Sequence, residues 1–146
     1  MADLLAVFAD VEDVVMAIHS QLGALTGTVA PPKLDGRFVE VNRVGGADDG
    51  VSDRPLVFVA YYGLSYPDAK AMAAQAQQLM LAAAHRTVPY QDDTSPAAAA
   101  LRLAHPRGVL IDSVSTLAPP VELAPDNPEL RRKVATYRLI LRRPAP

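Results

Sequence analysis

Residues 54–62 read RPLVFVAYY, and this stretch decides the fold. Its apolar run begins at Leu56, and in an extended chain these residues fall on both faces, which predicts a strand buried on both faces. Such a strand belongs at the centre of a sheet, between neighbouring strands and beneath a covering layer. The rest of the fold follows from finding those neighbours and that layer.

The nearest neighbour precedes this strand in the chain. Residues Arg37–Val44 alternate Val39 and Val41 with polar residues, which is typical of a strand with one wet face. A polar loop of nine residues, Gly45–Asp53 (GGADDGVSD), links this strand to residues 54–62 and lets the two pair antiparallel. Because the loop has little apolar area to bury, we expect it to be mobile in an isolated subunit.

Two amphipathic stretches predict helices that cover the sheet. Over residues 10–27 apolar side chains recur at spacings of four and three, and Asp10 followed by Asp13 resembles an N-cap with an acidic third position. The second helix is expected over residues 67–86, because Pro67 is well tolerated in a first turn. The apolar stripe of the first helix comprises Leu4, Phe8, Val11, Val15, Ile18, Leu22 and Leu25.

Three further extended segments are expected. A short one covers Thr28–Pro32. A longer strand spans Gly108–Leu117 and resumes at Val121–Leu123, because the Pro119-Pro120 pair bends or splits a strand. The last, Lys133–Arg143, alternates apolar and basic residues and therefore predicts one wet face.

The length of 146 residues is typical of one domain. We expect a single domain over residues 1–146, with residues 1–9 as an N-terminal lead-in. Residues 87–107 form a proline-rich connection, within which Ala97–Leu103 can make one or two helical turns. The order of elements predicts an α/β fold of the α+β kind, a mixed and mainly antiparallel β-sheet covered on one face by two α-helices.

Composition excludes several classes of protein. The chain has no cysteine, which excludes disulfide scaffolds and thiol catalysis. Half of the residues are hydrophobic and 21% are charged, which argues against disorder, and a net charge of −2 argues against a generally basic nucleic-acid binder. No apolar run is long enough to span a membrane, and the N-terminus lacks the positive region of a signal peptide, so we expect a soluble protein.

Residues that carry chemistry do not gather into a motif. His19, His85 and His105 lack metal-ligand spacing, and each is expected at the surface or at a helix end. The pairs Asp48-Asp49 and Asp92-Asp93 lack the spacing of a calcium loop, and no GxSxG or phosphate-binding glycine motif occurs. We therefore expect no catalytic residue, no metal and no cofactor. A small enzyme or ligand-binding domain whose site forms only in three dimensions stays an alternative.

Charge is distributed unevenly along the chain. Residues 1–53 carry nine acidic and three basic side chains, a net −6, whereas residues 131–146 carry six basic and no acidic side chains. One interpretation is a solvated strand face; the other is a surface that meets an acidic partner, either a neighbouring copy or a nucleic acid. The basic residues are Arg131, Arg132, Lys133, Arg138, Arg142 and Arg143.

Seven segments, in this order, resemble the tail terminator proteins of long, non-contractile-tailed bacteriophages, especially those that infect actinobacteria. They are FADVEDVVMAIHSQL, the APP after it, RFVEVNRVGG, RPLVFVAYYG, PDAKAMAAQAQQLM, and GVLIDSV followed by PPVELAPDNPELRRKVATYRLILR. Together they cover most of the chain. The proline-rich insert at residues 89–106 is longer than the family pattern.

The resemblance implies a structural role without catalytic residues or a cofactor. Members of this family form a hexameric ring that caps the finished tail tube, ends its polymerisation and offers a surface to the head-side connector. The partners implied for this chain are copies of itself in a homohexamer, the major tail tube protein and the head-side connector or stopper protein. Genome DNA would pass through the channel without sequence-specific binding, and no membrane is involved. The implied location is the head-proximal end of the tail in the virion, after assembly in the host cytoplasm.

Two candidate surfaces follow for such a ring. The six basic residues near the C-terminus are candidates for a subunit interface or for the channel wall. The candidate contact loop contains Gly45, Gly46, Asp48, Asp49 and Asp53. Another head–tail joining or neck protein of the same kind of particle remains the alternative function.

Overall fold

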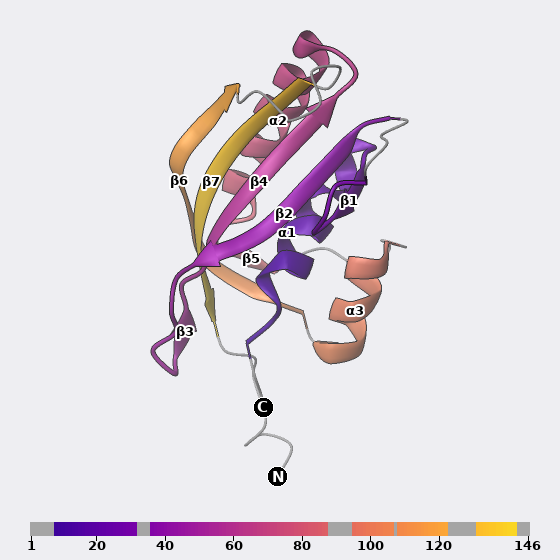
Figure 1. Cartoon of the computed structure of the whole chain (residues 1–146). Helices are drawn as coiled ribbons and strands as arrows, with labels where there is room; N and C mark the ends of the chain where they lie inside the picture. The colour runs from indigo at the N-terminus through magenta and orange to yellow at the C-terminus, as the bar shows by residue number, and fades with distance from the viewer. Residues whose placement is uncertain (1–7, 32–35, 88–94, 107, 123–130, 143–146) are drawn as a thin grey trace.

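The structure is a computed structural model, and it describes residues 8–31, 36–87, 95–106, 108–122 and 131–142. Within the described residues, one helical segment precedes four consecutive strands, and two further helices lie on either side of a short strand before the last two strands (Figure 1). The helices are α1 (Val11–His19), the short 3-10 helix η2 (Ser20–Leu22), α2 (Tyr66–Ala82) and α3 (Pro96–Ala104). The strands are β1 (Leu25–Gly27), β2 (Phe38–Gly45), β3 (Ser52–Asp53), β4 (Leu56–Gly63), β5 (Arg86–Thr87), β6 (Leu110–Glu122) and β7 (Arg131–Arg142).

All strands join one sheet in the order β1-β2-β4-β7-β6-β5, and β3 pairs with one end of β7. β1 and β2 run parallel, and every other pairing is antiparallel. The apolar strand β4 lies between β2 and β7, and Val59 is opposite Val41 on one side and Ala135 on the other. The predicted mixed, mainly antiparallel sheet is therefore confirmed, and the predicted central strand is central.

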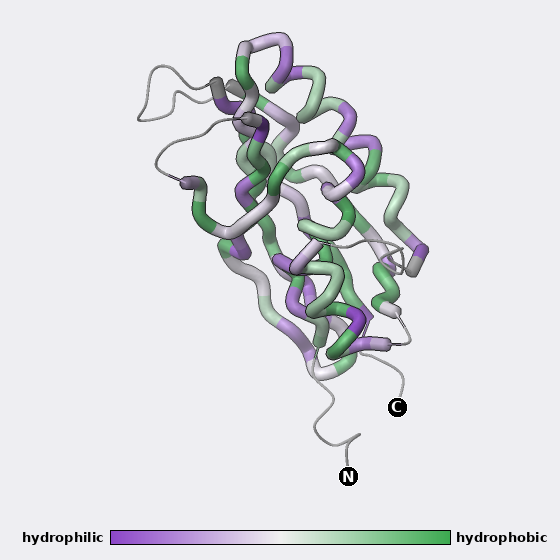
Figure 2. The backbone as a smooth tube through the Cα atoms, turned by 90° about the vertical axis from the view of Figure 1, so that its right-hand side faces the viewer, coloured by the Kyte–Doolittle hydropathy of each residue, from purple (hydrophilic) through white to green (hydrophobic). Residues whose placement is uncertain are grey.

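The helices form a layer on one face of the sheet (Figure 1). α2 packs on β4, β7 and β6, whereas α1 packs on β2 and also contacts α3. Hydrophobic and polar residues alternate along the helices in Figure 2, as expected of helices with one buried side. The core between the two layers includes Val15, Ile18, Val59, Tyr61, Met80, Tyr137, Leu139 and Leu141.

The first helix is shorter than its apolar spacing predicts. Asp10 caps it as expected, accepting a hydrogen bond from the Glu12 amide at 2.9 Å. The α-helix ends at His19, and one 3-10 turn follows before Gly23 adopts a left-handed conformation with φ of 67°. Such a glycine stops a helix. Leu25 consequently belongs to β1 and is 75% exposed, so it is not part of the buried stripe; Leu4 lies outside the described residues.

Three other boundaries differ from the predictions. The extended segment expected over residues 28–32 forms no strand in its described part, residues 28–31; the strand nearby is β1, which ends at Gly27. The second helix ends at Ala82, and Arg86 already pairs in β5. The one or two turns expected at residues 97–103 are the full helix α3, because Ser95 caps its first turn by accepting from the Ala98 amide.

The two C-terminal strands follow the sequence pattern. In β7 the residues Tyr137, Leu139 and Leu141 are buried, while Arg138 and Arg142 are exposed on the opposite face. β6 is one strand with register shifts on both sides of Ala118, where the proline pair lies. The predicted bend is thus accommodated by bulges rather than by a break.

Candidate functional site

The candidate contact loop is a hairpin that projects beyond the end of the sheet (Figure 1). We call residues 46–52 the finger. Its backbone closes on itself, because the Asp49 amide donates to the Ser52 carbonyl at 3.0 Å and Asp48 forms an antiparallel bridge with Asp53. Residues 46–51 are all exposed. The finger is therefore a shaped protrusion, and its mobility in an isolated subunit stays a prediction.

Carboxylates hold the tip of the finger. The Asp49 side chain accepts from the amides of Ser52 at 2.7 Å and Val51 at 2.9 Å, and Asp48 accepts from the Gly50 amide at 3.1 Å. The Ser52 amide, and then the Val51 amide, keep the pKa of Asp49 below its usual range. These are the hydrogen bonds of Asx turns, in which a short side chain replaces a backbone acceptor.

Gly46 allows the chain to enter the finger. Its φ of 86° lies in the left-handed region, and a Cβ atom there would stand 2.1 Å from the Arg54 carbonyl oxygen. No other residue can occupy that space. Backbone geometry therefore explains why glycine occupies position 46.

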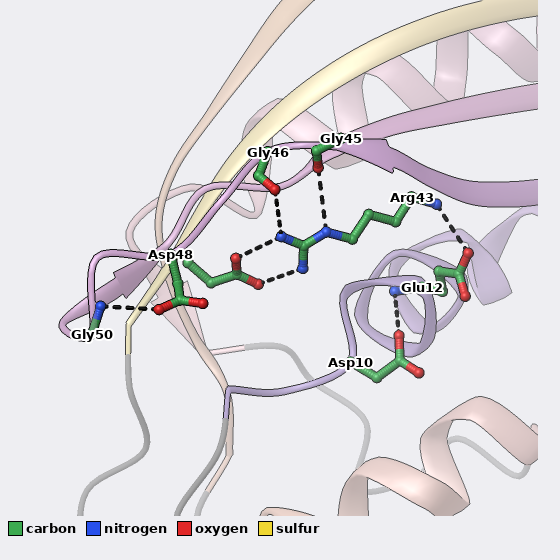
Figure 3. Close-up of polar contacts among 8 residues, drawn as sticks. Asp10, Glu12, Arg43, Gly45, Gly46, Asp48 and Gly50 are labelled. Atoms are coloured by element: carbon green, nitrogen blue, oxygen red, sulfur yellow. Dashed lines mark hydrogen bonds and ion pairs between the residues drawn. The ribbon is translucent and has the colours of Figure 1, made fainter.

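An arginine clamp fixes the base of the finger (Figure 3). The Arg43 guanidinium donates to both carboxylate oxygens of Asp53 at 2.8 Å and to the carbonyl oxygens of Gly45 at 3.3 Å and Gly46 at 3.2 Å. Asp53 is buried, and its hydrogen bonds raise the pKa of Arg43. The Arg43 amide in turn donates to Glu12 at 2.9 Å, so the clamp joins β2, the finger and the start of α1.

A depression of about 320 Å³ lies beside the clamp. Five charged residues and three apolar ones line it: Asp10, Glu12, Arg43, Asp48 and Asp53, with Phe8, Ala9 and Val11. Nearby, partial burial and then repulsion from Asp10 and Glu12 raise the pKa of Asp13. Within the described residues, no group of three or more histidine, aspartate and glutamate side chains is placed to hold a metal ion.

The predicted basic residues do not form one cluster. In β7, Arg142 pairs with Asp112 at 3.2 Å, and Arg132 donates to the Tyr62 hydroxyl at 3.3 Å. Lys133 points to the helix-covered side, where it lies 4.9 Å from the Tyr66 ring centroid. Arg138 is exposed and makes no ion pair with any residue that the structure describes. Arg143 and the side chain of Arg131 lie outside the described residues.

The contact loop and the basic strand meet where β3 pairs with β7. Ser52 pairs with Arg142, and Asp53 with Leu141, where β3 runs beside the end of β7. Of the five contact-loop residues, Asp53 is turned inward to the clamp, and the other four are partly or fully accessible. Their role in binding another molecule stays a prediction.

The sheet face opposite the helices, which we call the open face, holds a small apolar cluster that was not among the predicted site residues. Phe38, Ala60, Tyr62 and Val134 are buried there, with Phe58 and Ala30 packed against them. The segment after β1 folds over this cluster, since the Ala30 amide donates to Glu40 at 2.8 Å. The signal was present in residues 54–62, whose apolar residues fall on both faces of the strand.

His19 lies at the end of α1, one of its two expected positions, and it is buried there rather than at the surface. Its Nδ1 lies 2.7 Å from the Val15 carbonyl oxygen, which can only accept, so Nδ1 carries the proton. Nε2 then accepts from the Tyr61 hydroxyl at 2.8 Å. Burial lowers the pKa of His19 to about 4, so the ring is neutral and serves the core.

No helix within the described residues is long and apolar enough to cross a bilayer. Comparison with known protein families gives no match, and neither does comparison with curated protein sequences. The fold is similar to that of a chain in a solved structure described as "Virion of native gene transfer agent (GTA) particle". The two chains share 14% sequence identity with a TM-score of 0.53, over 88% of this chain and 84% of that one. The likeness shows a shared fold.

Proposed function

We propose that this chain is a structural protein of a phage-like virion and, more narrowly, the terminator of its tail tube. The observation that carries the proposal is the shared fold with a chain of a virion particle, over most of both chains. The order of sequence segments that resembles tail terminators supports the same role independently. A non-catalytic role agrees with the site, because the clamp's charged groups Arg43 and Asp53 are engaged with each other.

In this role the chain acts as one domain in a homohexameric ring at the head-proximal end of the tail. One side of the ring would contact the major tail tube protein and the other the head-side connector or stopper protein, with genome DNA passing through the channel. A ring requires two different contact surfaces on each copy. The projecting finger and the exposed Arg138 on the open face supply two such surfaces of opposite charge.

Location in the particle tests the role. Purified particles labelled with an antibody against this chain are expected to show one label at the head-proximal end of each tail. Label along the whole tube, or particles without the chain, would refute the terminator role. Two results together would favour another head–tail joining protein: label at the neck of normal particles, and tails of normal length in particles made without the chain.

Tail length provides the second measurement. If the gene is deleted, tubes are expected to grow beyond their normal length, because nothing occupies the growing end. Supplying the wild-type chain in trans is the control and is expected to restore the normal length.

A further inference from the structure

We propose that the finger of one copy docks on the β6 and β7 half of the open face of a second copy, beside Arg138. This inference rests on the proposed function and deepens it, because it names the two surfaces through which copies would join.

The finger is built for contact rather than for stability. Two of its carboxylates accept the hydrogen bonds that hold its exposed shape, and two valine side chains, one in the finger and one beside it in β2, are exposed to water. Val51 is 70% exposed near the tip, and Val44 is 59% exposed at the base. A preorganised protrusion loses little conformational entropy on binding, so its apolar side chains can contribute most of their transfer free energy.

The receptor lies along the outer edge of the sheet. Only Leu110 and Ile111 of β6 pair with β5, and no other described strand pairs with that edge. An unpaired edge of this length is normally covered or blunted, and the proline pair and bulges of β6 disfavour the addition of another strand here. Side-chain contact remains open to the edge, which presents Leu117, 49% exposed, and Val121, 51% exposed. Val121 is opposite Val134, which places it on the open face.

Charge selects this partner for the finger. Arg138 is opposite Ser115 of β6 and exposes a guanidinium that no described residue neutralises. The finger carries Asp48 and Asp49, and the Arg54 guanidinium stands 3.7 Å from Asp49 in an exposed pair. An acidic, valine-bearing protrusion and a basic, leucine-bearing edge are complementary, and such complementarity fixes partner and register.

The two surfaces are different parts of the same molecule. The finger points away from the sheet at the end where β2 leads into β3, whereas the receptor runs along the length of β6 (Figure 1). A contact between different patches of identical copies is heterologous, and it closes into a ring when the rotation allows. The occupant of the receptor is thus a second copy of this chain.

The absence of cysteine permits a direct test. In the full chain, Val51→Cys and Leu117→Cys together place one thiol on the finger and one on the receptor. Oxidation is expected to give a ladder of covalent oligomers larger than a dimer, because each copy can be linked on both sides. A disulfide needs Cα atoms within about 7 Å, so random collision links poorly. The control pairs Val51→Cys with Leu103→Cys on α3, which is 88% exposed against 49% for Leu117, so its accessibility favours linkage in the control; it is expected to stop mainly at dimers.

A charge exchange tests the same contact without cross-linking chemistry. In the double-cysteine chain, Arg138→Glu is expected to lower the ladder yield by roughly tenfold, and adding Asp48→Lys to restore it. Circular dichroism of each variant checks that it folds. A ladder no stronger than the control, both in the purified chain and in isolated tails, would overturn the proposal, as would linkage of the finger to a different tail protein. If the ladder forms but the chain is absent from tail ends, this contact stands and the terminator role is refuted. If the chain is at tail ends but the ladder does not form, the contact alone is refuted.

Discussion

The helix-covered face of the sheet and the finger are stabilised by opposite means. The covered face is apolar and almost free of exposed area, with residues such as Val59 and Leu139 completely buried. The finger is polar and exposed, and its shape depends on carboxylates, one arginine and one glycine. The body of this protein is thus stabilised by burial, whereas its most prominent surface feature is stabilised by local hydrogen bonds.

The largest expected effect compares two neighbours in β7. Leu139→Ala removes a fully buried side chain and should lower the free energy of unfolding by about 2–5 kcal/mol. Ile140→Ala is the matched control, because its side chain lies on the open face and is only half-buried; it should cost about 1 kcal/mol or less. Urea unfolding measures both, and equal losses would mean that the open face is as closed as the covered one.

Acid should weaken the covered face through His19. The unfolded chain binds a proton on this ring near pH 6.5, while the folded chain excludes it until the pKa of about 4. Stability is therefore flat above pH 6.5 and falls as the pH drops from 6.5 to 4, by roughly 3 kcal/mol in total. Partial burial also lowers the pKa of His105, which adds a loss of the same sign.

Two histidine variants test whether this pH dependence of stability arises from His19. His19→Gln removes the titrating ring and is expected to flatten the curve of stability against pH between 4 and 6.5. His85→Asn is the control, since His85 is exposed and its φ of 62° suits asparagine. Retention of the full slope in His19→Gln would show that the acid sensitivity arises elsewhere.

The base of the finger should tolerate change better than the core. Asp53→Asn keeps the shape of the side chain but removes the buried charge that meets Arg43, and we expect a loss of about 1–2 kcal/mol. Asp112→Asn breaks the more exposed pair with Arg142 and should cost between about 0 and 1 kcal/mol. Thermal unfolding of the two variants compares a buried with an exposed ion pair, and a reversed order would contradict the clamp.

The same division explains what the sequence could predict. The central position of residues 54–62, the antiparallel pairing with residues 37–44 and the wet face of β7 were all visible as side-chain periodicity, because burial follows that periodicity. The end of α1 was missed because apolar spacing continues to Leu25, although Gly23 carried the stop signal. Periodicity reports which face is buried and not where the backbone turns.

Polar pairing left almost no sequence signal. Arg43 and Asp53 are ten residues apart and look like two solvated charges, and only the turn at Gly46 brings them into contact. His19 reads as a polar residue at a helix end, and its burial depends on Tyr61 from a strand that is 42 residues away. Such contacts depend on the tertiary fold rather than on local sequence pattern. The sequence could therefore place the candidate site in the loop but could not predict its side-chain contacts.

The smallest expected effect on stability, and the sharpest on the finger, comes from Asp49→Ala. The substitution removes the acceptor of the Val51 and Ser52 amides, so hydrogen exchange at these two positions should accelerate by roughly tenfold or more while the unfolding midpoint stays close to the wild type. Asp48→Ala is the matched control, because it removes only the acceptor of the Gly50 amide. In the wild-type chain the same protection should persist at neutral pH and disappear as the pH falls through the lowered pKa of Asp49, since a protonated carboxyl is a weaker acceptor. If the wild-type amides already exchange at the unprotected rate, the finger is the mobile loop that its composition predicts, and the contrast between a buried body and a preorganised protrusion fails.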